Sequence, residues 1–181
     1  IGDYYAFKDD DMTSNCGAVV NIGHQKTTIS IFSKGLLTNV KIIDLGGLNI
    51  DNDLSYIYKI NDDVARKLKE NLVTCDINLA LSSDTLEVIN NDGAKLMVNQ
   101  YDVSKIANSR LNEILEIVKR DLTHLTKKEL KFIMFTGGVS EIDNFENMIN
   151  DKFGHMAILG RIKNLGVRNN KYSSAFGLIK W

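Results

Sequence analysis

Residues 17–32 read GAVVNIGHQKTTISIF, and their pattern indicates two adjacent strands. The small and apolar run at 17–22 suits a buried strand, and the alternation at 27–32 suits a second strand beside it. Only four residues separate the two runs, and such a short connection favours antiparallel pairing. The alternation then continues as far as Leu45, which predicts a third strand and an antiparallel meander.

Further strands and helices are predicted along the rest of the chain from apolar spacing and capping residues. In order they are helices at 51–58 and from 62 onward, a hairpin of 86–88 and 96–98, a helix at 103–125, a strand at 132–136, a helix capped by Ser140 and ended by Gly154, a strand at 157–159 and a helix at 173–179. The acidic residues 1–15 are expected to be irregular, with the aspartates at 9–11 in a solvated loop rather than a cation site.

This order of elements is typical of the ribonuclease-H-like fold. Three antiparallel strands come first, alternating helices and strands come last, and an additional α+β piece lies between them. We therefore predict an α/β, ribonuclease-H-like lobe formed by residues 1–47 and 131–181. Residues 48–130 are predicted to form an inserted α+β subdomain.

The composition indicates an ordered globular protein. Of the 181 residues, 44% are hydrophobic and 25% are charged, and these values argue against disorder. The formal net charge of -1 gives no electrostatic reason to expect nucleic acid or an anionic membrane as the main partner. No apolar run approaches the ~20 residues of a membrane span. The start at Ile1, without an initiator Met, suggests an excised fragment.

The two cysteines, Cys16 and Cys75, lie far apart in the sequence. Neither has a second cysteine or a histidine at metal-ligand spacing. Two reduced thiols are therefore expected, with an isolated disulfide as the alternative.

Three glycine-bearing turns fall at the ends of predicted strands, at Gly23, at Gly46–Gly47 and at Gly137–Gly138. Glycine allows backbone N–H groups to approach an anion closely, and a following helix N-terminus adds positive potential. Three such turns on one sheet suggest contacts to phosphate and nucleoside at its open edge. Plain turn chemistry is the alternative.

Several segments, taken in order, resemble the motifs of one family of actin-like proteins. Residues 20–27 resemble the second phosphate loop of actin-like ATPases, usually D-x-G-G-G-T-T. The FtsA motif G-G-x-x-x-T-N-D-I is resembled by Leu45-Gly46-Gly47 with Asn52-Asp53-Leu54, and the A-E-x-x-K helix of FtsA is resembled by residues 65–69. Residues 135–139 resemble the adenosine motif. Residues 167–179 resemble the closing FtsA motif R-N-P-x-Y-(A/S)-x-A-x-G-L. The resemblance implies the second lobe of such a protein, subdomains 2A and 2B, and favours FtsA over MreB or the pilus protein PilM.

The resemblance also implies a set of nucleotide-binding residues. Gly23 and Thr27 would contact phosphate, Lys69 would lie near the ribose or adenine, and residues 137–139 would line the adenosine. The full predicted set is Asn21, Gly23, His24, Gln25, Lys26, Thr27, Gly47, Lys69, Gly137, Gly138 and Val139. No catalytic residue and no protein metal ligand is predicted.

The phosphate loop departs from the family pattern in ways that predict weak or altered nucleotide use. Asn21 replaces an aspartate that holds Mg²⁺ through water, and an amide does not compensate the charge of the cation. His24 and Gln25 replace two glycines and leave the backbone less room. Lys26 replaces a threonine, and Arg66 replaces a glutamate. ATP and Mg²⁺ are the candidate ligands of the full-length protein, and no tight binding is expected in this fragment.

The predicted helix at 103–125 carries a second, mixed strip beside its apolar stripe. Ile106, Arg110, Glu113 and Ile117 form this strip, in which Arg110 either pairs internally with Glu113 or anchors a partner. The resemblance implies that the partner is the C-terminal tail of FtsZ, which is short and carries acidic residues. Arg110 is the predicted anchor, and Lys105 and Asn112 are weaker candidates.

The resemblance therefore implies a fragment of a cell-division adaptor that recruits FtsZ. The full-length protein would self-associate into actin-like filaments and work in the cytoplasm at the inner face of the cell membrane, which it would reach through a C-terminal helix absent from this chain. The alternatives are the second lobe of an active ATPase and a PilM-like pilus assembly protein.

Overall fold

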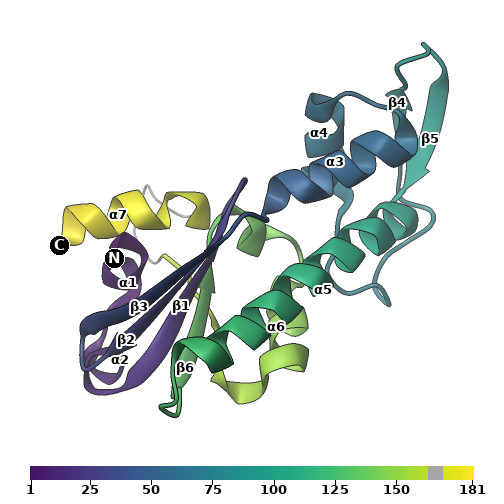
Figure 1. Cartoon of the computed structure of the whole chain (residues 1–181). Helices are drawn as coiled ribbons and strands as arrows, with labels where there is room; N and C mark the ends of the chain where they lie inside the picture. Colours follow the sequence, from purple (N-terminus) through teal and green to yellow (C-terminus); the bar gives the residue numbers. More distant parts are fainter. Residues whose placement is uncertain (163–168) are drawn as a thin grey trace.

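The structure is a computed structural model that describes residues 1–162 and 169–181. Its centre is a five-stranded sheet with the strand order β3-β2-β1-β6-β7 (Figure 1). The strands are β1 (Cys16–Ile22), β2 (Thr27–Ser33), β3 (Leu36–Ile43), β6 (Phe132–Thr136) and β7 (Ala157–Leu159). The first three form the predicted antiparallel meander, while β6 pairs parallel with β1 and β7 pairs parallel with β6.

The remaining elements are helices and one small hairpin. The helices are α1 (Gly2–Phe7), α2 (Asp10–Ser14), α3 (Gly47–Tyr58), α4 (Asp62–Leu72), α5 (Gln100–Leu125), α6 (Phe145–Phe153) and α7 (Ser173–Lys180), and the hairpin consists of β4 (Thr85–Ile89) and β5 (Lys95–Asn99). Figure 1 shows α3, α4 and the hairpin extending away from the five-stranded sheet, with the long α5 running back to it. This mixed α/β architecture agrees with the predicted fold class.

The apolar run of β1 is explained by burial on both faces of the sheet. Val20 belongs to the larger hydrophobic cluster, which also holds Ile29 of β2 and Leu111 of α5. Val19 points the other way, into a smaller cluster that contains Tyr4 of α1. The larger cluster continues without interruption into α3, α4 and the hairpin, so α5 carries one core from the sheet into the inserted part.

The prediction that residues 1–15 are irregular was wrong, because they form α1 and α2. Asp9 caps α2, where its side chain accepts a hydrogen bond from the backbone N–H of Met12. Tyr4 is fully buried and stacks on Phe32, with ring centroids 3.9 Å apart. Helices this short are stabilised by packing rather than by their own sequence, and apolar periodicity over so few residues gives no clear signal.

The start of the helix after β6 was also placed wrongly. Residues 138–141 form a 3-10 turn, in which the buried Ser140 hydroxyl donates to the Gly137 carbonyl at 2.8 Å. α6 begins only at Phe145, after Asn144 in the left-handed conformation. Asn144 tolerates that conformation better than most residues, and it delays the helix by one turn.

Candidate functional site

Two of the three glycine corners are joined by backbone hydrogen bonds. The N–H of Gly47 donates to the carbonyl of Gly23 at 2.9 Å, and the N–H of Leu48 donates to the carbonyl of His24 at 2.6 Å. A Cβ atom at Gly46 would lie 2.7 Å from both of these carbonyl oxygens. The loop after β1 and the start of α3 therefore meet so closely that only glycine fits between them.

The third corner lies beside them because β1 and β6 are parallel neighbours. Asn21 pairs with Thr136 in the register of these strands, so both chains leave the sheet at the same edge. Gly137 has a positive φ of 98°, and a Cβ there would lie 2.5 Å from Asn21 Oδ1 and from the Ile22 carbonyl oxygen. The predicted convergence of the glycine corners is thus present in the structure.

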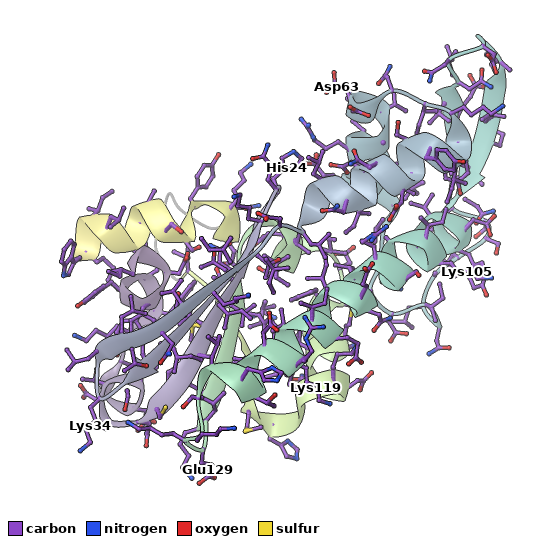
Figure 2. The ribbon with its side chains drawn as sticks, in the orientation of Figure 1. His24, Lys34, Asp63, Lys105, Lys119 and Glu129 are labelled. Atoms are coloured by element: carbon purple, nitrogen blue, oxygen red, sulfur yellow. The ribbon has the colours of Figure 1, made fainter. Side chains whose placement is uncertain are left out.

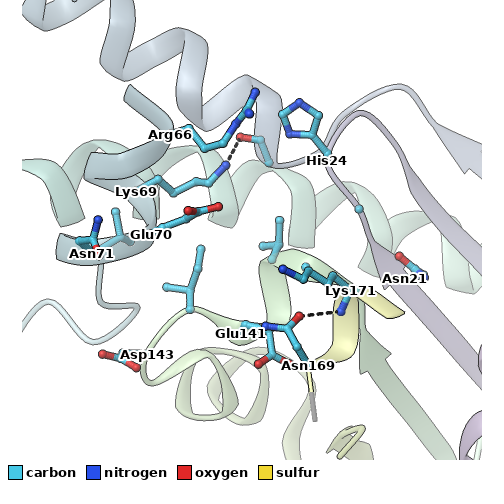
Figure 3. A pocket seen from close by; sticks show the side chains of 17 residues that line it. Asn21, His24, Arg66, Lys69, Glu70, Asn71, Glu141, Asp143, Asn169 and Lys171 are labelled. Carbon is cyan, nitrogen blue, oxygen red and sulfur yellow. Dashed lines mark hydrogen bonds between the residues drawn. The ribbon is translucent and has the colours of Figure 1, made fainter. Parts of the chain in front are cut away.

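A pocket of about 760 Å³ opens at this edge, between the sheet and α4 (Figure 3). Most of the residues predicted to bind nucleotide line it, namely Asn21, Gly23, His24, Gly47, Lys69, Gly137, Gly138 and Val139. Figure 2 shows His24 at the tip of the β1–β2 turn, next to the start of α3. Glycine corners, a lysine and a helix N-terminus together suit a ligand that carries phosphate.

Three predicted residues, Gln25, Lys26 and Thr27, do not line the pocket. Thr27 is buried, and its hydroxyl donates to the carbonyl of Leu45 at 2.8 Å. The amine of Lys26 lies 3.2 Å from the carboxylate of Asp44, on the exposed side of the turn. In this arrangement the Thr27 hydroxyl ties the start of β2 to the chain after β3.

A buried ion pair forms one wall of the pocket. The amine of Lys69, on α4, lies 2.7 Å from Oδ1 and 2.9 Å from Oδ2 of Asp51, on α3, and donates to the Gly47 carbonyl at 3.1 Å. The side chains of Lys69 and Asp51 are 10% and 1% exposed. His24 Nδ1 is 3.9 Å from the same carboxylate. Lys69 thus links α4 to α3 at the edge of the pocket.

Asn21 is held by a carboxylate that the sequence did not reveal. Its side-chain amide donates to Asp3 Oδ2 at 2.9 Å. The other oxygen of Asp3 accepts from the hydroxyls of Ser173 at 2.6 Å and Ser174 at 2.8 Å, at the start of α7. This places one negative charge next to residue 21, where the family motif carries the charge on residue 21 itself.

Other pocket residues were not part of the predicted set. They are Arg66, Glu70, Asn71, Val73, Glu141, Ile142, Asp143, Asn169 and Lys171. Arg66, already noted as a departure from the family pattern, lies one α-helical turn before Glu70 on the pocket side of α4, and this spacing could have identified Glu70. Lys171 comes from the closing motif, and a Cβ at Gly138 would lie 3.7 Å from its Cβ. Residues 167 and 168 of that motif lie outside the described residues.

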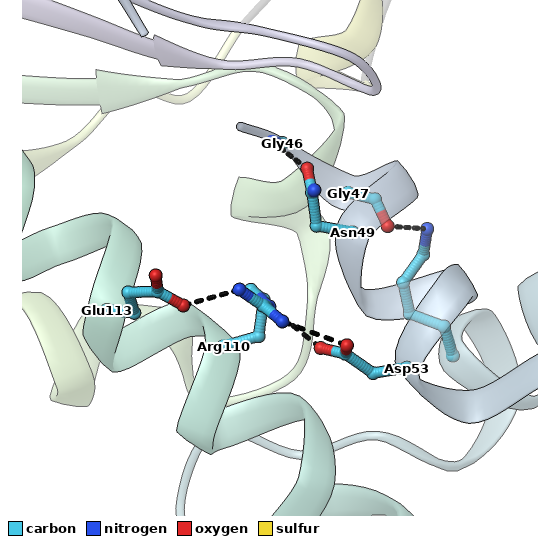
Figure 4. Close-up of polar contacts among 7 residues, drawn as sticks. Gly46, Gly47, Asn49, Asp53, Arg110 and Glu113 are labelled. Atoms are coloured by element: carbon cyan, nitrogen blue, oxygen red, sulfur yellow. Dashed lines mark hydrogen bonds and ion pairs between the residues drawn. The ribbon is translucent and has the colours of Figure 1, made fainter. Parts of the chain in front are cut away.

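The strip on α5 is organised around Arg110 (Figure 4). Its Nε lies 2.7 Å from Asp53 Oδ2 and its Nη2 lies 2.9 Å from Asp53 Oδ1, while Nη1 donates to Glu113. The hydrogen bonds that Arg110 donates to Asp53 are the largest cause of the raised pKa of Arg110. Internal pairing with Glu113, one of the two alternatives, is therefore present, and Asp53 of α3 is an additional partner.

The other strip residues surround this network with mixed character. Ile106 and Ile117 are half-buried, whereas Lys105, Asn112 and Glu113 are exposed. Figure 2 shows Lys105 near the N-terminal end of α5 and Lys119 further along the helix. The strip therefore presents apolar and charged groups side by side.

Neither cysteine forms a disulfide, as expected, since both thiols are free. Burial raises the pKa of the Cys75 thiol to about 12, so this group stays protonated and unreactive at neutral pH. Within the described residues, no group of three His, Cys, Asp or Glu side chains could hold a metal ion. The helices of the described part include none that is long and apolar enough to span a membrane.

Comparisons with solved structures support an actin-like fold. MreB5 of Spiroplasma citri bound to ADP superimposes with a TM-score of 0.80 at 15% identity, over 98% of this chain and 56% of that one. A PilM–PilN type IV pilus biogenesis complex gives a TM-score of 0.72 at 12% identity, over 98% of this chain and 49% of that one. The predicted ribonuclease-H-like fold class of the actin-like ATPases is confirmed.

Sequence comparisons identify the family. The chain is 29% identical to the cell division protein FtsA of Bacillus subtilis over 91% of its own length, and 25% identical to that of Pseudomonas aeruginosa over 90%. It spans 38% and 41% of the length of these two relatives. The family model described as cell division protein FtsA matches residues 18–177. The chain therefore belongs to the FtsA family of actin-like cell division proteins.

Proposed function

We propose that this chain is the lobe of an FtsA-family adaptor that binds the C-terminal tail of FtsZ along the strip on α5. The observation that carries the proposal is the position of Arg110, whose side chain is 27% exposed between the half-buried Ile106 and Ile117. Arginine beside accessible apolar side chains is typical of binding hot spots. A short tail with acidic and apolar residues would match both parts of the strip.

The test is a titration of the chain with a synthetic FtsZ C-terminal tail peptide. We expect Arg110→Ala to weaken binding about tenfold, which corresponds to about 1.4 kcal/mol, because the acidic peptide loses its charge-assisted partner. Arg120→Ala is the matched control, since Arg120 lies on the same helix and its side chain is 63% exposed. No binding by the unmodified chain, or equal binding by Arg110→Ala, would remove the docking proposal.

We further propose that the pocket forms part of an ATP site that is completed in the whole protein. Glycine corners, Lys69 and the cationic side chains of Arg66 and Lys171 support this assignment. The glycine corners and cationic side chains fit a phosphate-bearing ligand better than a tightly held Mg²⁺. Asn21 itself brings no charge, and the neighbouring carboxylate of Asp3 is engaged by Asn21, Ser173 and Ser174. When bound, Mg²⁺ would offset the charge of the phosphates through water held near Asn21.

For the chain alone, we expect ATP to bind with a dissociation constant of about 1 mM or weaker, about 4 kcal/mol. Gly138→Val should abolish this binding, because the side chain would project into the pocket with no close contact other than Lys171. Titration calorimetry measures the affinity, and circular dichroism checks that the variant is folded. Tight binding, or fast phosphate release by the full-length protein, would instead favour the alternative, the second lobe of an active ATPase.

Family membership also supports two proposals about the whole protein. It would self-associate into actin-like filaments, and it would act in the cytoplasm at the inner face of the cell membrane. Sedimentation of the full-length protein with and without nucleotide tests the first proposal.

A further inference from the structure

The hydrogen-bonding edge that Arg110 would offer to an acidic partner is already occupied. Asp53 binds the Nε–Nη2 edge of the guanidinium in a bidentate arrangement, at 2.7 Å and 2.9 Å. A carboxylate from another molecule would choose the same geometry, because two parallel N–H groups match its two oxygens. The two carboxylates therefore compete for one edge.

We propose that Asp53 is a built-in competitor that lowers the affinity of this surface for acidic peptides and restricts it to partners able to displace it. The inference rests on the proposed docking function. Asp53 regulates that site from α3, a helix that is separate in sequence from α5 and packs against it.

The exposure of the pair shows that displacement is feasible. The side chains of Arg110 and Asp53 are 27% and 29% exposed, so water reaches the pair and weakens it relative to a fully buried one. Asp53 can therefore leave Arg110 without stranding a buried charge.

Glu113 keeps the arginine in place when Asp53 leaves. It lies three residues after Arg110 on the same helix and accepts from Nη1, outside the edge that Asp53 uses. Loss of the Asp53 charge should thus open the Nε–Nη2 edge while the guanidinium stays oriented. Asp53 itself is held in place by its helix. α3 begins at the pocket, where Gly47 and Asp51 bind Lys69 of α4, and this fixes the position of Asp53 beside Arg110.

The test compares Asp53→Asn with the unmodified 181-residue chain in a titration with the FtsZ tail peptide. Asparagine keeps the shape of the side chain and removes its charge. We expect binding to become about two- to fivefold tighter, the range for release of a partly exposed ion pair. Asp63→Asn is the matched control for net charge, since Asp63 lies on α4 with its side chain 87% exposed (Figure 2). It should change the affinity less than about twofold.

A second measurement does not depend on any partner. Exchange of the Arg110 Nε–H with water, followed by NMR, should be slow in the unmodified chain and fast in Asp53→Asn. Fast exchange in the unmodified chain would show that the edge is free and would overturn the inference, whatever the peptide does. Unchanged or weaker binding by Asp53→Asn would overturn the inference alone. No binding by either protein, with slow exchange in the unmodified chain, would overturn the docking function and this inference with it.

Discussion

Lys69→Ala is expected to lower the free energy of unfolding by about 3–5 kcal/mol. The substitution leaves the carboxylate of Asp51, which is 1% exposed, without its cation. It also removes the hydrogen bond to the Gly47 carbonyl, which helps to hold the start of α3. Urea unfolding followed by circular dichroism measures the change.

Two further variants separate the charge effect from a general effect on α4. Lys67→Ala changes an exposed lysine two residues earlier in the same helix and should cost less than about 0.5 kcal/mol. Lys69→Met combined with Asp51→Leu replaces both charges and should recover most of the loss, because apolar side chains of similar volume often substitute for a buried pair. A loss below about 1 kcal/mol for Lys69→Ala would show that water reaches Asp51.

The same geometry limits what Lys69 can offer a nucleotide. An ammonium group has three donors, and the Gly47 carbonyl and the Asp51 carboxylate engage it from the α3 side. At most one donor remains for a ligand, and part of the charge is already compensated. Lys69 therefore stabilises the fold first and contributes to the pocket second, which agrees with the weak nucleotide binding expected of the lobe.

The sequence predicted the elements whose signals are local and missed the contacts made across long separations. The convergence of Gly23, Gly47 and Gly137 was predictable, because each glycine ends a strand with a clear apolar pattern. The pair between Asp53 and Arg110 was not, since 57 residues separate the two and the pairing depends on how α3 packs on α5. The strip on α5 was predicted, but not the carboxylate that occupies it.

The environment of Asn21 illustrates the same limit. Comparison with the family motif shows an amide where an aspartate is usual, which suggests a simple loss of charge. The compensating carboxylate of Asp3 lies in a segment that was expected to be irregular and became part of a helix through packing against α7. From the sequence alone, asparagine in place of the family's aspartate at position 21 therefore suggests that the site has lost its negative charge. The contact with Asp3 shows that a negative charge is present on a neighbouring residue instead.

Asn21→Asp, which restores the family motif, is consequently expected to destabilise the chain by about 2–3 kcal/mol. It removes a hydrogen bond to a charged group, and it brings two carboxylates to the 2.9 Å separation that Asn21 Nδ2 and Asp3 Oδ2 now have. The loss should shrink in acid, where one carboxyl of such a pair takes up a proton. Urea unfolding at neutral and acid pH measures both effects.

Exchanging the two residues tests whether the charge has been relocated. Asp3→Asn combined with Asn21→Asp again places one amide opposite one carboxylate, so it should recover most of the stability that Asn21→Asp loses. The exchange also moves the negative charge to a residue that lines the pocket, and it should therefore increase the effect of Mg²⁺ on ATP affinity. If Asn21→Asp alone is as stable as the unmodified chain, the Asp3 carboxylate does not disfavour a second carboxylate at position 21. The asparagine at position 21 is then not explained by its interaction with Asp3 of α1.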